Sequence, residues 1–392
     1  MKKIICCLIA IAMLVLLCGC GSSKEDTSGV KIGLICLHDE NSTYDLNFIN
    51  AFKDACETTG VEYMIKTNVP ESGDCYDAAA DLADSGCNIV FADSFGHEDY
   101  MIEAARDFPN VEFCHATGTK AHTEGVDNYH NAFAAIYEGR YIDGVALGMK
   151  LNEMIKNGVI TADEAKVGYV GAMQYAEVIS GYTSFFLGVR SVCPTATMMV
   201  TFTGTWYDEA LEKEAANALI SRGCVVISGH ADSMGSPTAC EIAGVPFVFY
   251  NGSIASTCPN TFITSTRIDW TPYFEYIIDC VKNGYPINTD WVGTIATGSV
   301  VMTEVNEAVA AEGTIDAVNN LIEQFKAGNI HVFDTSTFTV RGLEVRECLA
   351  DVDTDEAYTG DTNAVFDGYF HESEFRSAPY FDLLIDGITF ME

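Results

Sequence analysis

Basic residues are scarce in this chain of 392 residues. Lysine and arginine together number 21, against 56 aspartates and glutamates, which gives a formal net charge of -35. Binding to nucleic acid requires lysine and arginine to neutralise phosphates, and docking on anionic lipid requires a basic surface. The composition therefore argues against nucleic acid as a partner and favours a neutral or cationic ligand.

Motifs for the commonest enzyme chemistries are also missing. The chain has no G-x-x-x-x-G-K-[ST], no G-x-G-x-x-G that opens a helix after the first predicted strand, no H-E-x-x-H and no G-x-S-x-G. Its eight histidines include no pair at metal-ligand spacing on one helix. We predict a protein without catalytic activity, metal or cofactor. One enzymatic alternative stays open, in which Asp39 and Asp232 face each other as paired acids.

The beginning of the chain is typical of an exported lipoprotein. A basic start precedes an apolar run that is too short for a convincing transmembrane helix, and small and polar residues follow at once. The sequence Leu17-Cys18-Gly19-Cys20 resembles a bacterial lipobox. We expect residues 1–19 to be a signal peptide and residues 20–29 a tether. Lipid on Cys20 would then anchor the chain to the extracytoplasmic face of the cell membrane. An uncleaved anchor is the alternative.

The 15 cysteines do not form a metal or disulfide pattern. Four lie in the leader or at its end, and the others are spread singly, without C-x-x-C pairs. Cys36, Cys87, Cys114 and Cys224 lie inside apolar runs, where a free thiol behaves as a small hydrophobic group. We therefore predict mostly buried thiols, although an exported chain can also form disulfides.

Beyond the tether, apolar runs of strand length alternate with segments of helical period. The predicted strands are 30–37, 61–69, 87–95 and 111–118, and then 166–173, 197–204, 224–231 and 246–252. The predicted helices are 47–58, 74–85, 98–107, 131–156, 176–190, 207–222 and 236–243. Such alternation is typical of parallel sheets covered on both faces. Because one core stops growing near roughly 250–300 residues, we expect two α/β lobes.

Candidate binding residues follow the carboxyl ends of the predicted strands, where ligands of parallel sheets collect. They are Tyr44, Phe95, Trp206, Asp232 and Asn251. Aromatic rings with few positive charges suit a planar, polar heterocycle, which needs stacking faces and in-plane hydrogen bonds. Trp206 is the strongest candidate, because it follows a strand through Gly204 and precedes a polar helix start.

Each candidate also has a purely structural interpretation, which the sequence leaves open. Trp206 could fill a core, Tyr44 could pack the first helix, and Phe95 could cover the end of its own strand. Asp232 could cap the next helix. Asn251, which precedes a glycine, is a natural turn residue.

Several segments carry a resemblance when they are taken together. They are ADSFGHED (92–99), PNVEFCHATGTK (109–120), YEGRYIDGVALG (137–148), KVGYVGAM (166–173), FFLGVRSVCP (185–194), TGTWYDEALEKEAANALISRGCVVISGHADS (203–233) and TSTRIDWTPYFEYI (264–277). The chain resembles the basic membrane protein family of substrate-binding lipoproteins for ABC transporters, especially its purine-binding branch. The resemblance implies two Rossmann-like lobes joined by a hinge, the type I architecture of periplasmic binding proteins. It also implies a purine nucleoside or nucleobase in the cleft that Tyr44, Phe95, Trp206, Asp232 and Asn251 would line.

Two positions depart from the family pattern. Where this branch usually has Gly-Trp-Thr-Tyr, the chain has Asn41-Ser42-Thr43-Tyr44, so one expected stacking ring is missing. Nucleoside-binding relatives often place an aspartate for ribose at the strand end that here contains Tyr250-Asn251-Gly252. The need for ribose therefore stays open.

The predicted lobes and function follow from these observations. We expect an N-terminal lobe of residues 30–125 plus about 255–290, a C-terminal lobe of 126–254 plus about 291–345, and an acidic surface elaboration at 346–392. The predicted function is capture of a purine nucleoside or nucleobase for an ABC-transporter permease. The alternatives are a sugar receptor of the same fold, with Arg267 as the nearest arginine, a secreted enzyme, and an adhesive surface lipoprotein.

Overall fold

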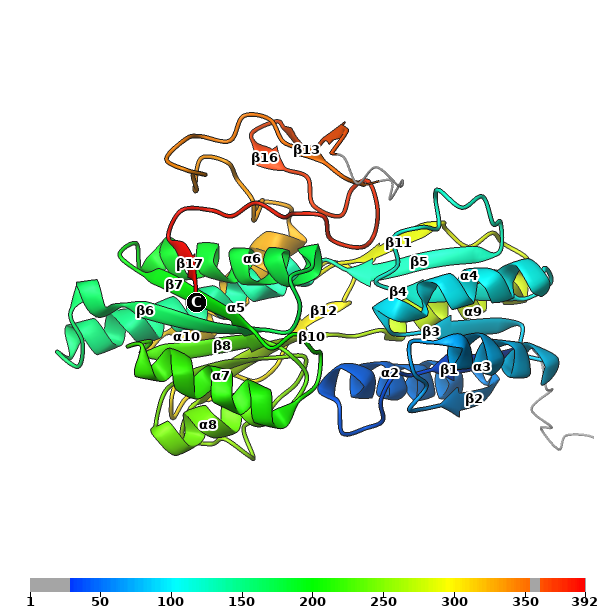
Figure 1. The fold of residues 1–392 in the computed structure, drawn as a ribbon, viewed down its shortest axis with the longest axis horizontal. Coiled ribbons are helices and arrows are strands. Elements are labelled where there is room, and N and C mark those ends of the chain that lie inside the picture. Colours follow the sequence, from blue (N-terminus) through cyan, green and yellow to red (C-terminus); the bar gives the residue numbers. More distant parts are fainter. Residues whose placement is uncertain (1–28, 353–359, 392) are drawn as a thin grey trace, which may run out of the picture.

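The computed structural model describes residues 29–352 and 360–391. The expected signal peptide, the expected acylation site Cys20 and the tether up to residue 28 lie outside the described residues. The described chain forms two α/β lobes along the long axis of the molecule, each built on its own sheet (Figure 1). This confirms the predicted fold class.

The N-terminal lobe contains a six-stranded sheet in which all neighbouring strands are parallel. The strand order is β11-β5-β4-β3-β1-β2. The strands are β1 (Lys31–Ile35), β2 (Glu62–Lys66), β3 (Ile89–Ala92), β4 (Glu112–Ala116), β5 (Tyr129–Ala134) and β11 (Asp290–Gly293). The helices are α2 (Thr43–Thr59), α3 (Gly73–Asp84), α4 (Glu98–Asp107) and α9 (Thr271–Asn283), with a 3-10 turn η1 (Phe95–His97).

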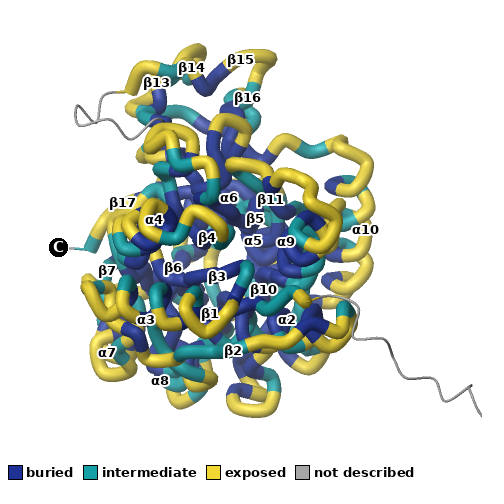
Figure 2. Tube along the Cα trace, turned by 90° about the vertical axis from the view of Figure 1, so that its right-hand side faces the viewer, coloured by how far each residue is buried: buried dark blue, intermediate teal, exposed yellow. Residues whose placement is uncertain are grey.

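Alternate residues of the central strand β3 pack into two different cores. Ile89 and Phe91 lie in the core that includes residues of α2 and α9, whereas Val90 and Ala92 lie in the core that includes residues of α3 and α4. Successive side chains of a strand point to opposite faces of the sheet. A short run without polar residues is therefore what a doubly covered sheet requires. Figure 2 shows the result, with buried strands inside and exposed stretches on the outer helices.

The C-terminal lobe contains a seven-stranded sheet with the order β12-β10-β9-β8-β6-β7-β17. The strands are β6 (Lys166–Gly171), β7 (Thr197–Phe202), β8 (Val226–His230), β9 (Phe247–Tyr250), β10 (Phe262–Ile268), β12 (Val300–Met302) and β17 (Ile388–Phe390). The helices are α5 (Ile136–Lys156), α6 (Ala176–Val192), α7 (Glu209–Ser221), α8 (Gly235–Ala243) and α10 (Thr314–Lys326), with η2 (Ala162–Glu164). Within the two described ranges, no helix combines the length and hydropathy that a membrane crossing needs.

The chain passes between the lobes after β5, β10 and β11, and these crossings correct the expected boundaries. Residues from 126 onward were expected in the C-terminal lobe, but β5 pairs with β4 and β11 in the N-terminal sheet. Conversely, β10 pairs with β9 and β12 in the C-terminal sheet. The helix expected at 131–156 begins only at Ile136, because the fully buried residues before it form β5. Short apolar runs do not distinguish a buried strand from a helix.

The described cysteines are free thiols, as the sequence predicted. Ten of the eleven are buried, and Cys348 is partly exposed. Burial raises the pKa of the Cys56 and Cys114 thiols to about 12. These thiols therefore remain protonated and act as small apolar groups in the core.

The C-terminal segment is part of the core, which corrects the prediction of an acidic surface elaboration at 346–392. Strand β17 pairs in parallel with β7 and extends the C-terminal sheet. Phe381 stacks on Phe333 with 4.3 Å between ring centroids. The other short strands are β13 (Leu349–Ala350), β14 (Thr362–Asn363), β15 (Val365–Phe366) and β16 (Tyr369–Phe370). The acidic residues of this segment are interspersed with aromatic and aliphatic side chains, and many of these are buried.

The same segment also contacts the N-terminal lobe. The backbone N–H and the hydroxyl of Ser377 both donate to Oδ1 of Asp290 in β11, at 2.8 and 2.7 Å. His122 lies beside them, with Nδ1 at 3.2 Å from Asp290 Oδ2 and Nε2 at 3.0 Å from the Val352 carbonyl. The segment, drawn orange to red in Figure 1, thus joins both lobes along one side of the molecule.

Candidate functional site

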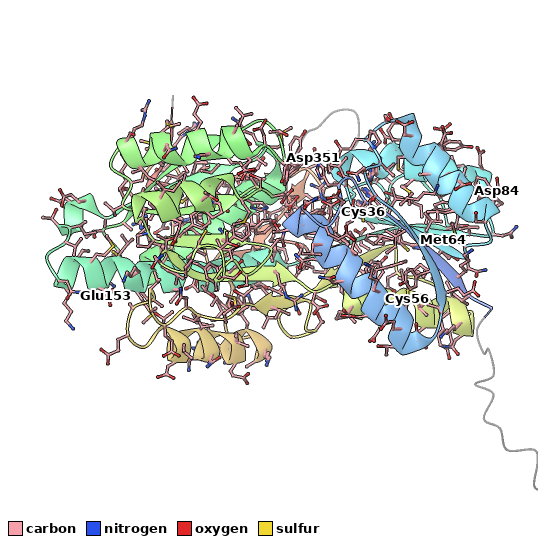
Figure 3. All side chains as sticks on the ribbon, turned by 90° about the horizontal axis from the view of Figure 1, so that it is seen from below. Cys36, Cys56, Met64, Asp84, Glu153 and Asp351 are labelled. Carbon is pink, nitrogen blue, oxygen red and sulfur yellow. The ribbon has the colours of Figure 1, made fainter. Side chains whose placement is uncertain are left out.

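A cavity lies between the lobes, beside the carboxyl ends of strands from both sheets. It is lined by Leu37, His38, Tyr44, Asp45, Ser94, Phe95, Thr117, Glu177, Trp206, Asp232 and Tyr250. Figure 3 places Cys36, one residue before this lining, at the end of the N-terminal lobe that faces the other lobe.

Three aromatic rings follow one another across the cleft. Phe95 of the N-terminal lobe lies 5.2 Å from Tyr175 of the C-terminal lobe, and Tyr175 lies 6.1 Å from Trp206, measured between ring centroids. Phe95 is 39% exposed, so it does not plug the end of its own strand. Of the three rings, Phe95 and Trp206 line the cavity, so each lobe offers apolar ring surface to a flat molecule, and Tyr175 lies between these two rings outside the lining.

Trp206 lies in the loop between β7 and α7, at the edge of the C-terminal core. Gly204 supplies the left-handed backbone that turns the chain out of β7, with φ at 77°. Asp208 then caps α7 by accepting hydrogen bonds from the N–H groups of Ala210 and Leu211 at 2.9 Å. The backbone carbonyl of Trp206 accepts a bond from the N–H of Asp232 at 3.0 Å. The indole is therefore partly exposed on a loop that is fixed at both ends.

Tyr44 combines the two roles that the sequence left open. Its ring lines the cavity and also packs edge-on against Phe48 in the same helix, with 5.0 Å between centroids. Its hydroxyl donates to the backbone carbonyl of Asp93 at 2.8 Å. Only the ring is thus available to a ligand as a contact surface.

Asp232 lines the cavity and does not cap the next helix. Helix α8 begins at Gly235 with Met234 at its N-cap position, which provides no side-chain cap. The Asp232 side chain is 6% exposed. Burial raises the pKa of this carboxyl well above its ordinary value, and the carboxylates of Asp45, Glu212 and Glu177 raise it further. Hydrogen-bond donors on a ligand therefore stabilise the ionised form of Asp232.

Asn251 is not among the residues that line the cavity. It follows β9 in a left-handed conformation, with φ at 65°, as its turn interpretation suggested. Its backbone carbonyl accepts a hydrogen bond from Nδ2 of Asn47 in α2, at 2.8 Å. This bond joins the two lobes beside the cavity. The structure thus brings four of the five predicted residues together and leaves Asn251 adjacent to them.

Two titratable pairs at the cavity were not predicted, one within the lining and one that joins Glu177 of the lining to His230 behind it. In the N-terminal lobe, Asp45 Oδ1 accepts from the His38 N–H at 2.8 Å, and Oδ2 lies 3.4 Å from His38 Nδ1. This contact raises the pKa of His38. In the C-terminal lobe, Glu177 Oε1 lies 3.4 Å from His230 Nε2 and accepts from the Tyr250 hydroxyl at 3.4 Å. Burial lowers the pKa of His230, which favours a neutral imidazole.

The sequence offered weak signals for the missed residues. Asp45 and Glu177 lie in the first turns of α2 and α6, where acidic residues ordinarily complement the helix dipole. Tyr175 immediately precedes α6. Only the approach of the second lobe makes these positions part of a site.

A buried cluster lies beneath the cavity. The thiol sulfur of Cys36 and one carboxylate oxygen each from Asp45 and Asp93 lie within 4.8 Å of one another. Oδ1 of Asp93 accepts from the Leu37 N–H at 3.1 Å, and Oδ2 has no hydrogen-bond partner within the described residues. Burial and the charge of Asp45 raise the pKa of Asp93 well above its ordinary value. A raised pKa favours a proton on Asp93, and this proton relieves the repulsion between the two carboxyls.

The enzymatic pair of Asp39 and Asp232 is not assembled. Asp39 does not line the cavity, and its Oδ1 accepts from the side chain of Asn41 at 2.7 Å. General acid–base catalysis requires both groups within reach of one substrate. The geometry therefore gives this alternative no support.

Comparison with known proteins agrees with the fold. The model of the Bmp family, described as ABC transporter substrate-binding protein PnrA-like, matches residues 35–332. The chain is 33% identical over 226 residues to a purine-binding protein of Brucella abortus, an alignment that covers 58% of this chain and 59% of that protein. It is 31% identical over 257 residues to a protein of Haloferax volcanii provisionally named as an ABC transporter glucose-binding protein, covering 65% and 61%. The chain thus matches about three fifths of the length of these relatives.

Solved structures support the fold alone. An ABC transporter solute-binding protein from Conexibacter woesei superposes with a TM-score of 0.60 at 19% identity, covering 77% of this chain and 98% of that chain. A solute-binding protein from Aeropyrum pernix gives 0.63 at 17% identity, covering 78% and 93%. Because the family model spans most of the chain, this protein belongs to the Bmp family of ABC transporter substrate-binding proteins.

Proposed function

We propose that this receptor captures a purine nucleoside or nucleobase between its lobes and delivers it to an ABC-transporter permease. The observation that carries the proposal is the series of rings formed by Phe95, Tyr175 and Trp206 across the cleft. A purine is flat and aromatic, so stacking on such rings stabilises it whichever polar groups it carries. The relative named for purine binding supports the same ligand class.

The charge of the cavity supports an uncharged or cationic ligand. Asp45, Glu177 and Asp232 line it, and no lysine or arginine is among the described residues of the lining. Phosphate groups are normally held by arginine clusters or by helix N-termini, and the helix N-termini of α2 and α6 beside this cavity already carry the carboxylates of Asp45 and Glu177. Nucleotides should therefore bind much more weakly than the corresponding nucleosides.

A sugar is the alternative ligand, and the relative from Haloferax volcanii favours it. Sugars also stack on aromatic rings, but a sugar receptor is expected to offer charged planar side chains, arginine above all. Arg267 does not line the cavity, and its guanidinium pairs with Asp269 at 3.2 Å. The lining therefore favours a purine over a sugar.

A thermal-shift panel of purine bases, nucleosides, nucleotides and sugars tests the ligand class. A ligand at a hundred times its dissociation constant adds about 2.7 kcal/mol to the stability of the folded state. We expect stabilisation by purine bases or nucleosides and little by nucleotides. Stabilisation by sugars alone would refute the purine assignment.

The proposed location is the extracytoplasmic face of the membrane, where lipid on Cys20 would hold the receptor near its permease. Two acyl chains are enough for stable anchoring. A Cys20→Ser variant should move from the membrane fraction to the soluble fraction when the cells are fractionated. A variant that stays with the membrane would instead point to an uncleaved anchor.

A further inference from the structure

The hydroxyl groups that line the cavity already donate to protein acceptors. Tyr44 donates to the Asp93 carbonyl at 2.8 Å, Ser94 to Oε1 of Glu71 at 2.6 Å, Thr117 to the Ala116 carbonyl at 2.5 Å, and Tyr250 to Oε1 of Glu177 at 3.4 Å. A hydroxyl has a single hydrogen to donate. These four groups therefore cannot also donate to a ligand without losing a bond within the protein.

Two acceptors of the lining are in the opposite situation, Glu177 at the start of α6 and Asp232 in the loop after β8. The third carboxylate, Asp45 of α2, already contacts His38 through both oxygens, at 2.8 and 3.4 Å. The contacts of Glu177 with His230 and with the Tyr250 hydroxyl use the same oxygen and are long, at 3.4 Å. Asp232 is 6% exposed, so little water reaches its carboxyl. A buried carboxyl without donors is costly, and donors from a ligand remove that cost.

The remaining side-chain donors of the lining are the ring N–H groups of His38 and Trp206 and the O–H of Asp232 when this carboxyl is protonated. The acceptors are more numerous, because the oxygens of the four hydroxyl groups can still accept a hydrogen bond, as can Glu177 and the second oxygen of Asp232. The cavity therefore contains more acceptors than available donors, and a complementary ligand must have the reverse.

We infer that this site selects ligands by the exocyclic amino groups they donate, so that amino-substituted purines such as adenine, guanine and 2,6-diaminopurine bind in preference to purines with oxo groups at the same positions. The inference rests on the proposed function and specifies its ligand class. Replacing an amino group by an oxo group directs a lone pair at an acceptor of the site, and the hydrogen that the neighbouring ring nitrogen gains lies at a different position on the purine edge. Sites built around hydrogen bonds reject such analogues far more strongly than apolar pockets do. We expect a preference of about tenfold to a hundredfold.

Calorimetric titration of the whole protein with a matched series of purines tests this inference. The expected order of affinity is 2,6-diaminopurine, adenine and guanine first, then hypoxanthine, and xanthine last. The inference is overturned if all of these purines bind and if hypoxanthine and xanthine have affinities equal to or higher than those of the amino-substituted members. That result would leave the proposed function intact. If no purine binds, the proposed function fails as well.

Two variants locate the selectivity. Asp232→Asn and Glu177→Gln each replace an acceptor oxygen with an N–H donor at nearly constant shape. Each should weaken the amino-substituted purines about tenfold and bring hypoxanthine closer to them. Glu209→Gln is the matched control, because Glu209 is exposed in the first turn of α7 and does not line the cavity. Unchanged selectivity in both variants would count against the inference even if the order in the parent protein were as expected.

Discussion

Trp206 is a partly exposed ring on a loop whose ends are fixed by hydrogen bonds. Its carbonyl accepts from Asp232, and the next helix is capped by Asp208 two residues later. These bonds hold the backbone without involving the indole. The backbone that carries the ring is thus preorganised, and little backbone entropy remains to be lost when a ligand binds.

Replacing Trp206 by alanine should weaken purine binding about tenfold to a hundredfold, which corresponds to roughly 1–3 kcal/mol for one stacked base. The reason is the loss of one of the three ring faces across the cleft. Calorimetric titration measures the change. Tyr285→Ala provides a control, because Tyr285 is 62% exposed and does not line the cavity. Normal affinity in Trp206→Ala would remove this residue from the site.

Glu372 is a buried carboxyl in the C-terminal segment. Its Oε1 accepts from the Tyr380 N–H at 3.2 Å, whereas Oε2 has no hydrogen-bond partner within the described residues. Burial raises the pKa of Glu372 from 4.5 to about 8, and hydrogen bonds and Arg376 only partly oppose this shift. The folded state therefore holds the proton more tightly than the unfolded state.

This shift makes the free energy of unfolding depend on pH. The Glu372→Gln variant tests the direction of that dependence. The raised pKa contributes its full stabilisation to the free energy of unfolding below pH 4.5. This stabilisation is lost as the pH rises to about 8, by up to about 1.4 kcal/mol per pH unit. Glutamine cannot ionise. The variant should therefore melt at a higher temperature than the parent at pH 9 and at a similar temperature near pH 4. The exposed Glu347→Gln serves as control, and an equal shift at every pH would contradict the prediction.

At the scale of elements, β17 extends the sheet of one lobe with residues from the end of the chain. Ile388 pairs with Met198 of β7 and is buried, whereas Phe390 is 45% exposed. The family model ends at residue 332, so it does not cover this strand. The C-terminal segment therefore contributes to stability from outside the region that the family shares.

Removing the buried side chain of this strand should destabilise the C-terminal lobe. Ile388→Ala is expected to cost about 2 kcal/mol, the lower part of the range for buried isoleucine, because the strand lies at a sheet edge. Phe390→Ser should change stability by much less. Thermal and denaturant unfolding measure both variants, and equal effects would show that β17 contributes little through burial.

At the scale of the whole molecule, contacts across the cleft indicate a closed arrangement of the lobes. His38 of the N-terminal lobe lies 5.7 Å from Tyr207 of the C-terminal lobe between ring centroids, and Asn47 donates to the carbonyl of Asn251. Binding proteins of this architecture close by bending at a hinge. Such contacts favour the closed state, and a ligand that binds between the lobes gains affinity from them.

Asn47→Ala should therefore weaken ligand binding although Asn47 does not line the cavity. The loss of one hydrogen bond of the closed state is expected to cost about 0.5–1.5 kcal/mol, or roughly twofold to tenfold in affinity. Calorimetry gives the affinity, and small-angle scattering gives the radius of gyration with and without ligand. Asn50→Ala, at an exposed position of the same helix, should bind normally. Equal affinities for the two variants would exclude a role of this bond in closure.

The sequence by itself determined the features that depend on neighbouring residues. The runs that became β1, β3, β6 and β8 are apolar over strand length, and Asp208 marks the start of α7 through its own capping bonds. Trp206 could be predicted as a site residue because its position after a strand and before a helix is a local property, and the structure places it in the lining of the cavity. The family resemblance then supplied the type I architecture, which the two sheets confirm.

Only the tertiary structure decided the features that depend on residues far apart in the chain. In the sequence alone, the segment that forms β5 resembles the start of a helix. Its pairing with β4 and β11 on both sides makes it a strand. The pairing of β17 with β7 joins residues about 190 positions apart. Tyr175, Glu177 and Asp45 became site residues only when the second lobe approached. Pairing and burial come from partners that no local pattern specifies, and this is why these assignments required the folded chain.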